Sequence, residues 1–216
     1  MIDFKEIARQ LRQPSGEPGI RAGIKMNEGN AFIYQCAVEA LELKPGSEIL
    51  EIGMGNGAFV SGIIEREKSV KYTGCDFSET MIEAALEINK TSVATGQSRL
   101  FLAAADTLPF PAGSFDSVFT INTIYFWDEP DSEISEIKRV LKKNGKFLVA
   151  IRPASTMKEM PFTQYGFHLY EKEEVETLLL ENGFTIVQVI EKTEPVQYIN
   201  GVPFYLETLI IVAELT

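Results

Sequence analysis

The sequence predicts an α/β fold with a doubly wound, seven-stranded, mostly parallel sheet that ends in an antiparallel terminal hairpin. Strand patterns alternate with helix patterns between Glu48 and Asn182, which is typical of a parallel sheet covered on both faces. The last two strand patterns have no helix between them, so we expect them to be antiparallel. The 216 residues suffice for one substantial core, which favours a single domain over residues 1–216.

Composition and charge exclude several classes of protein. The chain has 20 basic and 31 acidic residues, and its net charge of −11 opposes binding to nucleic acid or to an anionic membrane surface. No stretch reaches the roughly 18 apolar residues of a membrane helix, and the charged N-terminus is not a secretory signal. Cys36 and Cys75 have no metal or redox spacing, so we expect a cytoplasmic protein without a metal site. The oligomeric state stays open.

Residues 1–43 are predicted to form an N-terminal helical cap segment. The apolar residues between Phe4 and Leu11 have helical spacing, and "PSGEPG" (14–19) should break that helix. A second helix is predicted over Asn30–Leu43, because its apolar residues form one stripe and "KPG" ends it.

The following region predicts alternating strands and helices. The expected strands are 48–52, 70–75, 99–104, 115–121 and 146–151. One helix is expected around Phe59–Ile64, and a second follows Ser78, which can cap it. A third covers 131–142, with acidic residues at its start and lysines at its end, as the helix dipole prefers. "NG" (144–145) then turns the chain into the fifth strand. A fourth helix covers 171–182 and stops at Gly183.

The C-terminal part predicts two closing strands, 184–191 and 205–214. Between them, "YINGVPF" (198–204) contains the Asn-Gly pair that is typical of a hairpin turn. The final strand includes the apolar stretch Leu206–Ala213, which favours a central position in the sheet over an interface between molecules.

The turn after the first strand is the leading site, because ligands of doubly wound sheets lie at the carboxyl ends of the strands. "EIGMGNG" places Gly53, Gly55 and Gly57 there, and glycine lets a ligand approach the backbone. Asp76 closes the second strand, and a carboxylate there accepts hydrogen bonds from ribose hydroxyls. These features predict an adenosine-containing ligand, either a dinucleotide or a nucleotide sulfonium.

Glu51 favours the sulfonium. A carboxylate repels the pyrophosphate of a dinucleotide, whereas it attracts a ligand with an ammonium and a sulfonium group. Four motifs, "EIGMGNG", "GCDFS", "ADTLPFPAGSFDSV" and "IKRVLKKNGKFLV", then follow in order. Together they resemble class I S-adenosylmethionine-dependent methyltransferases of type 11, closest to the small-molecule group that includes ubiquinone- and menaquinone-type C-methyltransferases. The resemblance covers residues 43–151 well and the 171–183 helix loosely. "KKNG" stands where the family usually has Lys-Pro-Gly-Gly.

The resemblance implies S-adenosyl-L-methionine as the cofactor and assigns residues to its methionine and ribose parts. Glu51 and the turn with Gly53, Gly55 and Gly57 would hold the methionine part. Asp76 would bind the ribose hydroxyls.

The resemblance also implies an adenine side and a methyl end. Phe77 would lie against the adenine, and Met81 on the next helix belongs to the same set of cofactor-binding residues. Asp106, with Thr107 beside it, would contact the adenine amino group. Asn122, just past the fourth strand, would border the reacting methyl group.

No catalytic dyad is visible, and transfer from a sulfonium mainly requires alignment of the reactants and exclusion of water. The weak catalytic candidates are His168, which is the only histidine, and Tyr125. His168 has a surface or packing role as its alternative. The run from Tyr125 to Trp127 either lines a substrate pocket or packs in the core.

Two segments are expected to close the site. One is residues 24–34, from which Met26, Asn27 and Asn30 would approach the cofactor. The other is residues 152–170, a candidate substrate-side lid that is rich in aromatic residues and methionine.

The predicted function is S-adenosylmethionine-dependent methyl transfer to a small-molecule acceptor, by direct displacement at the sulfonium methyl. One alternative is a non-catalytic protein on the same fold that binds S-adenosylmethionine. A less favoured alternative is an NAD-dependent oxidoreductase. The sequence does not identify the acceptor, its nucleophilic atom or the pathway.

Overall fold

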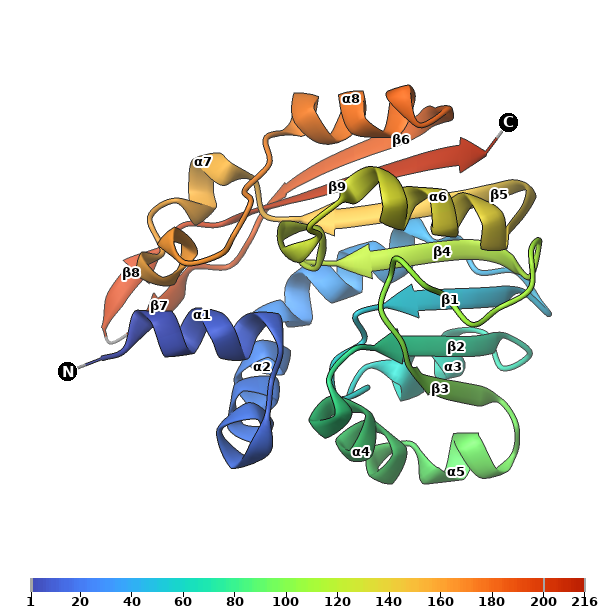
Figure 1. Ribbon diagram of the computed structural model, residues 1–216, viewed down its shortest axis with the longest axis horizontal. Helices are drawn as coiled ribbons and strands as arrows, with labels where there is room; N and C mark the ends of the chain where they lie inside the picture. The colour runs from blue at the N-terminus through green and yellow to red at the C-terminus, as the bar shows by residue number, and fades with distance from the viewer. Residues whose placement is uncertain (1, 200, 216) are drawn as a thin grey trace.

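Figure 1 shows the computed structural model, which describes residues 2–199 and 201–215. The strand order of its main sheet is β3-β2-β1-β4-β5-β9-β6. β1 to β5 pair in parallel, whereas β9 lies between β5 and β6 and is antiparallel to both. The predicted sheet and the central position of the last strand are therefore confirmed. The strands are β1 (Glu48–Ile52), β2 (Lys71–Asp76), β3 (Ser98–Leu102), β4 (Phe115–Ile121), β5 (Leu141–Ile151), β6 (Phe184–Thr193) and β9 (Glu207–Leu215).

Helices cover both faces of the sheet, so the central strands are apolar on both sides. One buried cluster contains Ile33 of α2, Val60 of α3 and Ile82 of α4, and the other contains Ile134 of α6 and Val175 of α8. The longer helices are α1 (Phe4–Arg12), α2 (Gly16–Ala40), α3 (Val60–Arg66), α4 (Glu79–Ile88), α6 (Pro130–Val140) and α8 (Lys172–Glu181). Short helices that the sequence did not predict are α5 (Lys90–Ala94), η1 (Ile124–Phe126), α7 (Ala154–Met157) and η2 (Pro161–Gln164).

The second helix begins far earlier than predicted. α2 starts at Gly16, inside the segment 14–19 that was predicted to end the first helix, and it ends at Ala40 rather than Leu43. The first helix does end before this segment, at Arg12. Pro18 lies in its first turn, where the backbone N–H has no partner within the helix. Gly23 lies in its interior because a Cβ there would approach Met81 Sδ at 3.1 Å. Close packing against α4 therefore outweighs the low helix propensity of these residues.

The junction of α6 and β5 also differs from the prediction. α6 ends at Val140, and the basic residues of its last turn are Lys138 and Arg139. Lys142 belongs to β5, where its Nζ lies 2.8 Å from Asp116 Oδ2. The predicted turn at Asn144 and Gly145 lies within a register shift of the strand, where Asn144 has a φ of 59°. The lysines thus extend the strand instead of ending the helix.

A small two-stranded sheet lies between β6 and β9 in the chain. β7 (Gln197–Ile199) and β8 (Val202–Phe204) are antiparallel, as expected for the predicted hairpin. Of its Asn-Gly pair, Asn200 lies outside the described residues, and Gly201 has a φ of 79°. In Figure 1 this hairpin lies beside α1, on the side toward which the carboxyl ends of β1 and β4 point.

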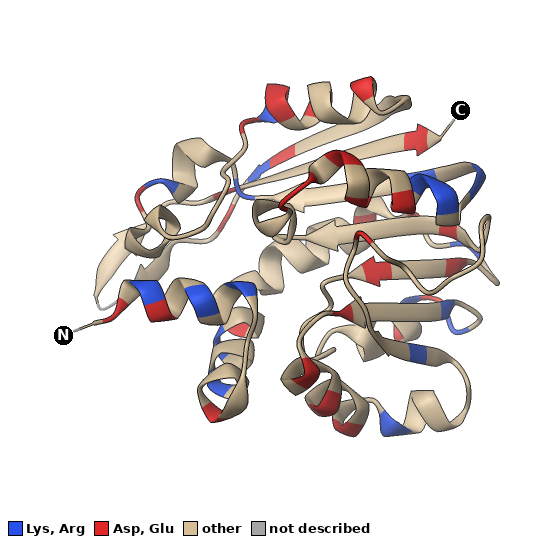
Figure 2. Ribbon diagram, viewed as in Figure 1, with Lys and Arg blue, Asp and Glu red and all other residues tan. Residues whose placement is uncertain are grey.

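Acidic residues dominate the surface of the helices. Figure 2 shows them along α4, α6 and α8, while basic residues gather on α1 and at the end of α6. On α1, Arg9 pairs with Glu6, and Arg12 pairs with Asp128. Within residues 2–199 and 201–215, no helix is both long and apolar enough to cross a membrane.

Candidate functional site

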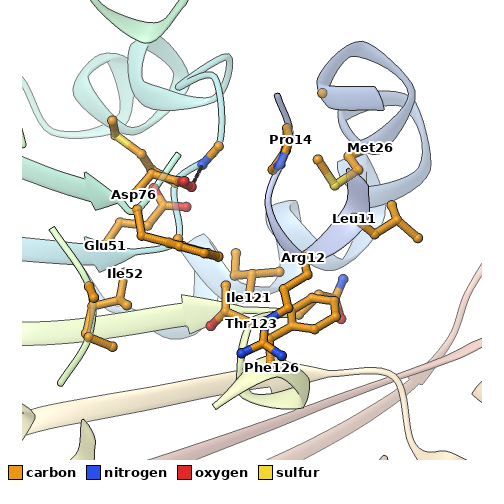
Figure 3. A pocket seen from close by; sticks show the side chains of 18 of the residues that line it. Leu11, Arg12, Pro14, Met26, Glu51, Ile52, Asp76, Ile121, Thr123 and Phe126 are labelled. Atoms are coloured by element: carbon orange, nitrogen blue, oxygen red, sulfur yellow. Dashed lines mark hydrogen bonds between the residues drawn. The ribbon is translucent and has the colours of Figure 1, made fainter. Parts of the chain in front are cut away.

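A cavity of about 250 Å³ lies at the carboxyl ends of β1, β2 and β4. In the sheet, β1 has β2 on one side and β4 on the other, so the strand order reverses at this point. Ligands of open α/β sheets bind where this reversal occurs. Figure 3 shows Glu51 and Asp76 on one wall and Leu11, Pro14 and Met26 of the N-terminal segment on the opposite wall.

The glycine turn after β1 forms the floor of the cavity. Gly53 has a φ of 75°, and a Cβ at this position would strike Thr123, so only glycine fits. Gly55 has a φ of 58°, and a Cβ there would meet no atom within 4 Å. The backbone of Gly55 therefore faces open space, which gives a ligand access to the main chain.

Asp76 is tied to this turn by its carboxylate. Oδ2 accepts a hydrogen bond from the Gly55 N–H at 2.9 Å, and Oδ1 accepts one from the Ser78 N–H at 2.9 Å. Burial raises the pKa of Asp76, and these backbone donors oppose that shift. The side chain lines the cavity. It is thus fixed in orientation and can accept hydrogen bonds from ligand hydroxyls.

Glu51 is held by two tyrosines, and no sequence pattern connects either of them with it. The hydroxyls of Tyr34 and Tyr72 both donate to Glu51 Oε2 at 2.6 Å. Within the described part of the chain, Oε1 has no hydrogen-bond partner, and Glu51 lines the cavity. Burial raises the pKa of Glu51 to about 7. The two tyrosine hydrogen bonds oppose this shift, and the nearby charge of Asp76 adds to it. The free oxygen can accept a hydrogen bond from a ligand cation.

One stripe of α2 forms the wall opposite the glycine turn. Its members are Gly23, Met26, Asn27, Asn30 and Tyr34, which all line the cavity. Counted from Gly23 they stand three, four, seven and eleven residues further on, which places them on one face of the helix. The sequence identified Met26, Asn27 and Asn30. It missed the stripe as a whole because the predicted helix started only at Asn30.

Only some of the residues predicted to bind the adenine line the cavity. Phe77 and Asp106 line the cavity, and Phe77 is 38% exposed. Gly57, Met81 and Thr107 do not line it. Gly57 accepts a hydrogen bond from the Asn89 side chain, Met81 packs against Gly23 of α2, and Thr107 is exposed at the surface.

Glu133 of α6 joins the adenine side without having been predicted. It lines the cavity and is 7% exposed, yet its Oε2 has no hydrogen-bond partner among the described residues. Burial raises the pKa of Glu133, and the charge of Asp106 adds to this shift. A buried carboxylate oxygen without a partner is costly unless a ligand supplies a donor. No sequence motif distinguished Glu133 from the other acids of α6.

Asn122 follows β4 and lies at the opposite end of the cavity, where its φ is 57°. Its Oδ1 accepts a hydrogen bond from the Tyr125 hydroxyl at 3.2 Å. The single proton of that hydroxyl is shared between Asn122 Oδ1 and the Arg152 carbonyl oxygen, which lies 2.8 Å away, and the hydroxyl oxygen accepts a hydrogen bond from the Arg152 N–H at 2.7 Å. Tyr125 is buried, burial raises its pKa, and it does not line the cavity. Its hydroxyl orients Asn122, whereas Phe126 and Trp127 reach the cavity wall.

The structure does not bring His168 to this cavity. His168 is exposed and lies over Tyr170, with ring centroids 4.5 Å apart, in a second hollow. Trp127 lines both hollows and stands between them. No residue of the 152–170 segment lines the cavity, although its η2 helix contacts α1. Residues of the N-terminal segment between Leu11 and Tyr34 line the cavity, and the Ser78 hydroxyl donates to the Pro14 carbonyl at 2.5 Å.

Comparison with known proteins agrees with this geometry. Residues 50–149 match the family model of the methyltransferase domain. The uncharacterized methyltransferase YdaC of Bacillus subtilis is 32% identical over 61% of this chain and 71% of its own length. The malonyl-[acyl-carrier protein] O-methyltransferase of Geobacter sulfurreducens is 24% identical over 97% of this chain and 80% of its own length.

The fold has close counterparts among solved structures. A SAM-dependent methyltransferase from Aquifex aeolicus superposes with a TM-score of 0.67 at 18% identity, and all of each chain is covered. At that identity the likeness concerns the fold alone.

Proposed function

The chain belongs to the type 11 methyltransferases of the class I S-adenosylmethionine-dependent group, and from this premise we propose that its methyl acceptor is a small molecule. The family predicted from the four sequence motifs is thereby confirmed, as is S-adenosylmethionine as the cofactor. The acceptor is the open question, and the features of the cavity support the proposed class.

The single observation that carries the assignment of this cavity to the methyl donor is the pair of carboxylates that flank the glycine turn. Glu51 offers one unpaired oxygen, and Asp76 offers fixed oxygens in the same cavity. This pair of acceptors fits the cofactor: we place the α-ammonium on Glu51 and the ribose hydroxyls on Asp76. When bound, the cofactor supplies an electrophilic methyl group on a sulfonium, which needs no further activation.

The adenine end is placed between two acids. An exocyclic amino group has two N–H donors, and Asp106 and Glu133 are two acceptors on neighbouring walls of the cavity. Phe77 gives the ring an aromatic surface. In this proposal the adenine supplies the donor that Glu133 Oε2 lacks in the protein alone.

Enclosure of the cavity favours a small acceptor. Residues of α1 and α2 form one wall of the cavity (Figure 3), which reduces its exposure to water and helps to hold the reactants in line. Arg12 of α1 and Asp128 close the rim with an ion pair of 2.6 Å. The acidic helices give no basic groove for a nucleic acid. Near the methyl end, Met26, Phe126 and Trp127 suit an apolar or aromatic acceptor.

Catalysis is proposed to rest on alignment rather than on a resident base. The residues that line the cavity include no histidine, and the Tyr125 hydroxyl is engaged by Arg152. An acceptor whose nucleophile ionises by itself near neutral pH fits such a site.

The test is a turnover screen with isotopically labelled methyl donor. The Geobacter relative is named for O-methylation and the motif resemblance is to C-methyltransferases, so phenols, carboxylic acids and activated carbon acids should all be included. Methylation of at least one small acceptor, with equimolar S-adenosylhomocysteine, is expected. Labelling of protein or nucleic acid with none of the small molecules would contradict the proposed acceptor class.

A further inference from the structure

A second polar cluster lies beside the cavity, just past the carboxyl end of β5. Arg152 Nε and Nη2 donate to Glu194 Oε1 and Oε2 at 2.7 Å and 2.9 Å. The two side chains are 9% and 0% exposed. Thr208 also donates to Glu194, at 2.9 Å. A buried charged pair persists only where the remaining donors and acceptors are satisfied, so the other contacts of Arg152 are informative.

The other contacts of Arg152 are hydrogen bonds to two residues of α2. Arg152 Nη1 donates to Asn30 Oδ1 at 2.9 Å, and Nη2 donates to the Gly29 carbonyl at 2.6 Å. The Gln197 side chain donates to the same carbonyl at 3.1 Å. A guanidinium has only donors, so Asn30 must present its oxygen to Arg152. The orientation of the Asn30 amide follows from this chemistry alone.

In that orientation the amide nitrogen of Asn30 is available to donate hydrogen bonds to a ligand in the cavity. Its oxygen also accepts a hydrogen bond from Asn122 Nδ2 at 3.2 Å, so it is engaged twice. Across residues 2–199 and 201–215, Asn30 Nδ2 has no partner, and Asn30 lines the cavity. Asn30 and Tyr34 are one turn apart on α2, and Tyr34 binds Glu51. The backbones of these two residues are therefore separated by only about 6 Å along the helix axis.

We propose that Arg152 is a positioning residue for the methionine end of the cofactor: it fixes Asn30 so that the amide N–H groups donate to the α-carboxylate. This inference rests on the proposed binding of S-adenosylmethionine in the cavity. The α-carboxylate and the α-ammonium share one carbon atom, so their protein partners must lie close together and have opposite polarity. Asn30 Nδ2 is a donor and Glu51 Oε1 an acceptor. Both side chains line the same cavity, and Tyr34, one turn from Asn30 on α2, binds Glu51 at 2.6 Å. Arg12 is the one cation among the described cavity residues, and it already pairs with Asp128.

The first test is Asn30→Asp, measured by calorimetry. The variant keeps an oxygen for Arg152 and Asn122, so the fold is preserved, but the donor toward the ligand becomes an anion. The two ligands are S-adenosylhomocysteine and its decarboxylated analogue S-adenosyl-3-thiopropylamine, which lacks only the α-carboxylate. We expect the Kd of S-adenosylhomocysteine to rise at least tenfold, while the Kd of the analogue stays within twofold or falls.

The second test is Arg152→Lys, with Arg139→Lys as its matched control. Lysine keeps the charge beside Glu194 but lacks the planar fork that serves Asn30 and Gly29 together. We expect about fivefold weaker binding of S-adenosylhomocysteine and no change for the analogue. Arg139 makes the same kind of fork with Glu136 near the adenine end, so Arg139→Lys should change both affinities by one common factor.

The ratio of the two affinities separates the outcomes. A merely structural role of Arg152 would weaken both ligands equally, and that result, or no change for either, overturns the positioning role. Failure of the unchanged protein to bind S-adenosylhomocysteine at all would instead remove the proposed site, and the inference with it. A selective loss in Asn30→Asp and Arg152→Lys, absent from Arg139→Lys, establishes the positioning role.

Discussion

Two arginine forks brace opposite ends of the cavity. Arg139 binds both oxygens of Glu136 at 2.7 Å and 2.6 Å and donates to the carbonyls of Leu108 and Phe110. Arg152 binds both oxygens of Glu194 and donates to Gly29 and Asn30. Each guanidinium thus serves one carboxylate and two further residues.

Their surroundings differ. Arg139 and Glu136 are one turn apart on α6, with side chains 36% and 23% exposed, and they hold the loop that carries Asp106. Arg152 and Glu194 come from segments far apart in the sequence, are almost fully buried, and hold α2. The adenine end is therefore braced by a local contact, whereas the methionine end depends on long-range contacts of the finished fold.

The largest expected effect of this difference is on stability. Arg152→Ala leaves Glu194 buried and unpaired, which should lower the free energy of unfolding by about 3–5 kcal/mol. Arg139→Ala removes a partly exposed pair and should cost about 1 kcal/mol. Urea denaturation of both variants measures the two losses. Equal losses would show that the forks do not differ in this way.

Asp76 should matter to both ends alike, because in our proposal it binds the ribose between them. Asp76→Ala is expected to weaken binding of S-adenosylhomocysteine and of its decarboxylated analogue by about 10- to 100-fold, the value of hydrogen bonds to a charged group. Calorimetry measures both. Asp116→Ala is the matched control, since Asp116 pairs with Lys142 and lies outside the cavity. Unchanged affinity in Asp76→Ala would contradict the ribose assignment.

Glu51 makes the methionine end sensitive to pH. Its pKa is raised to about 7 in the folded protein by burial, so the folded state binds a proton more tightly than the unfolded state does. The stabilising contribution of Glu51 is therefore full below its unfolded pKa of about 4.3 and is lost as pH rises through about 7. A ligand ammonium favours the ionised form, so cofactor affinity should rise with pH and level off above about 7.

That rise is limited to tenfold per pH unit, because one proton is released. Calorimetry of S-adenosylhomocysteine at pH 6 in buffers of different ionisation enthalpy measures the proton directly. Glu51→Gln should give weak binding that does not change over this range. Proton uptake on binding by the unchanged protein would contradict the placement of the ammonium on Glu51.

The smallest expected effect is that of His168→Ala. His168 lies in the second hollow, separated from the cavity by Trp127. Affinity for S-adenosylhomocysteine should change less than twofold, and so should turnover once an acceptor is known. A large loss of turnover with unchanged cofactor affinity would contradict this expectation and would support His168 as the catalytic base.

The two arginine contacts also show which parts of the site can be predicted from the sequence. The glycine turn, Asp76 and the Asp106 loop were predicted because each lies within one contiguous motif, and the sheet was predicted because each strand has its own local pattern. The adenine brace falls in the same motifs, although the sequence did not reveal the fork itself. The methionine wall was only partly predicted: Asn30 was identified, but Tyr34 and Arg152 were not. Their partners are remote in sequence, and no local pattern specifies which buried carboxylate an arginine or a tyrosine meets.

The candidate lid shows the same limit. Residues 152–170 were expected to cover the site because of their aromatic and methionine content. In the structure Met157, Met160 and Phe162 pack with Leu206 and Phe204 into a separate small core, so the lid stays a prediction. Composition could not distinguish a pocket lining from packing, whereas the helical spacing of the α2 stripe would have identified the true wall had α2 been predicted at full length.

The most direct test of the cavity is a calorimetric titration with S-adenosylhomocysteine, with NADH as the control ligand. Glu51 and the shape of the turn predict micromolar binding of the first ligand and none of the second, since a pyrophosphate beside that carboxylate is repelled. Binding of NADH, or no binding of S-adenosylhomocysteine, would contradict the assignment of the turn to the methionine end of S-adenosylmethionine.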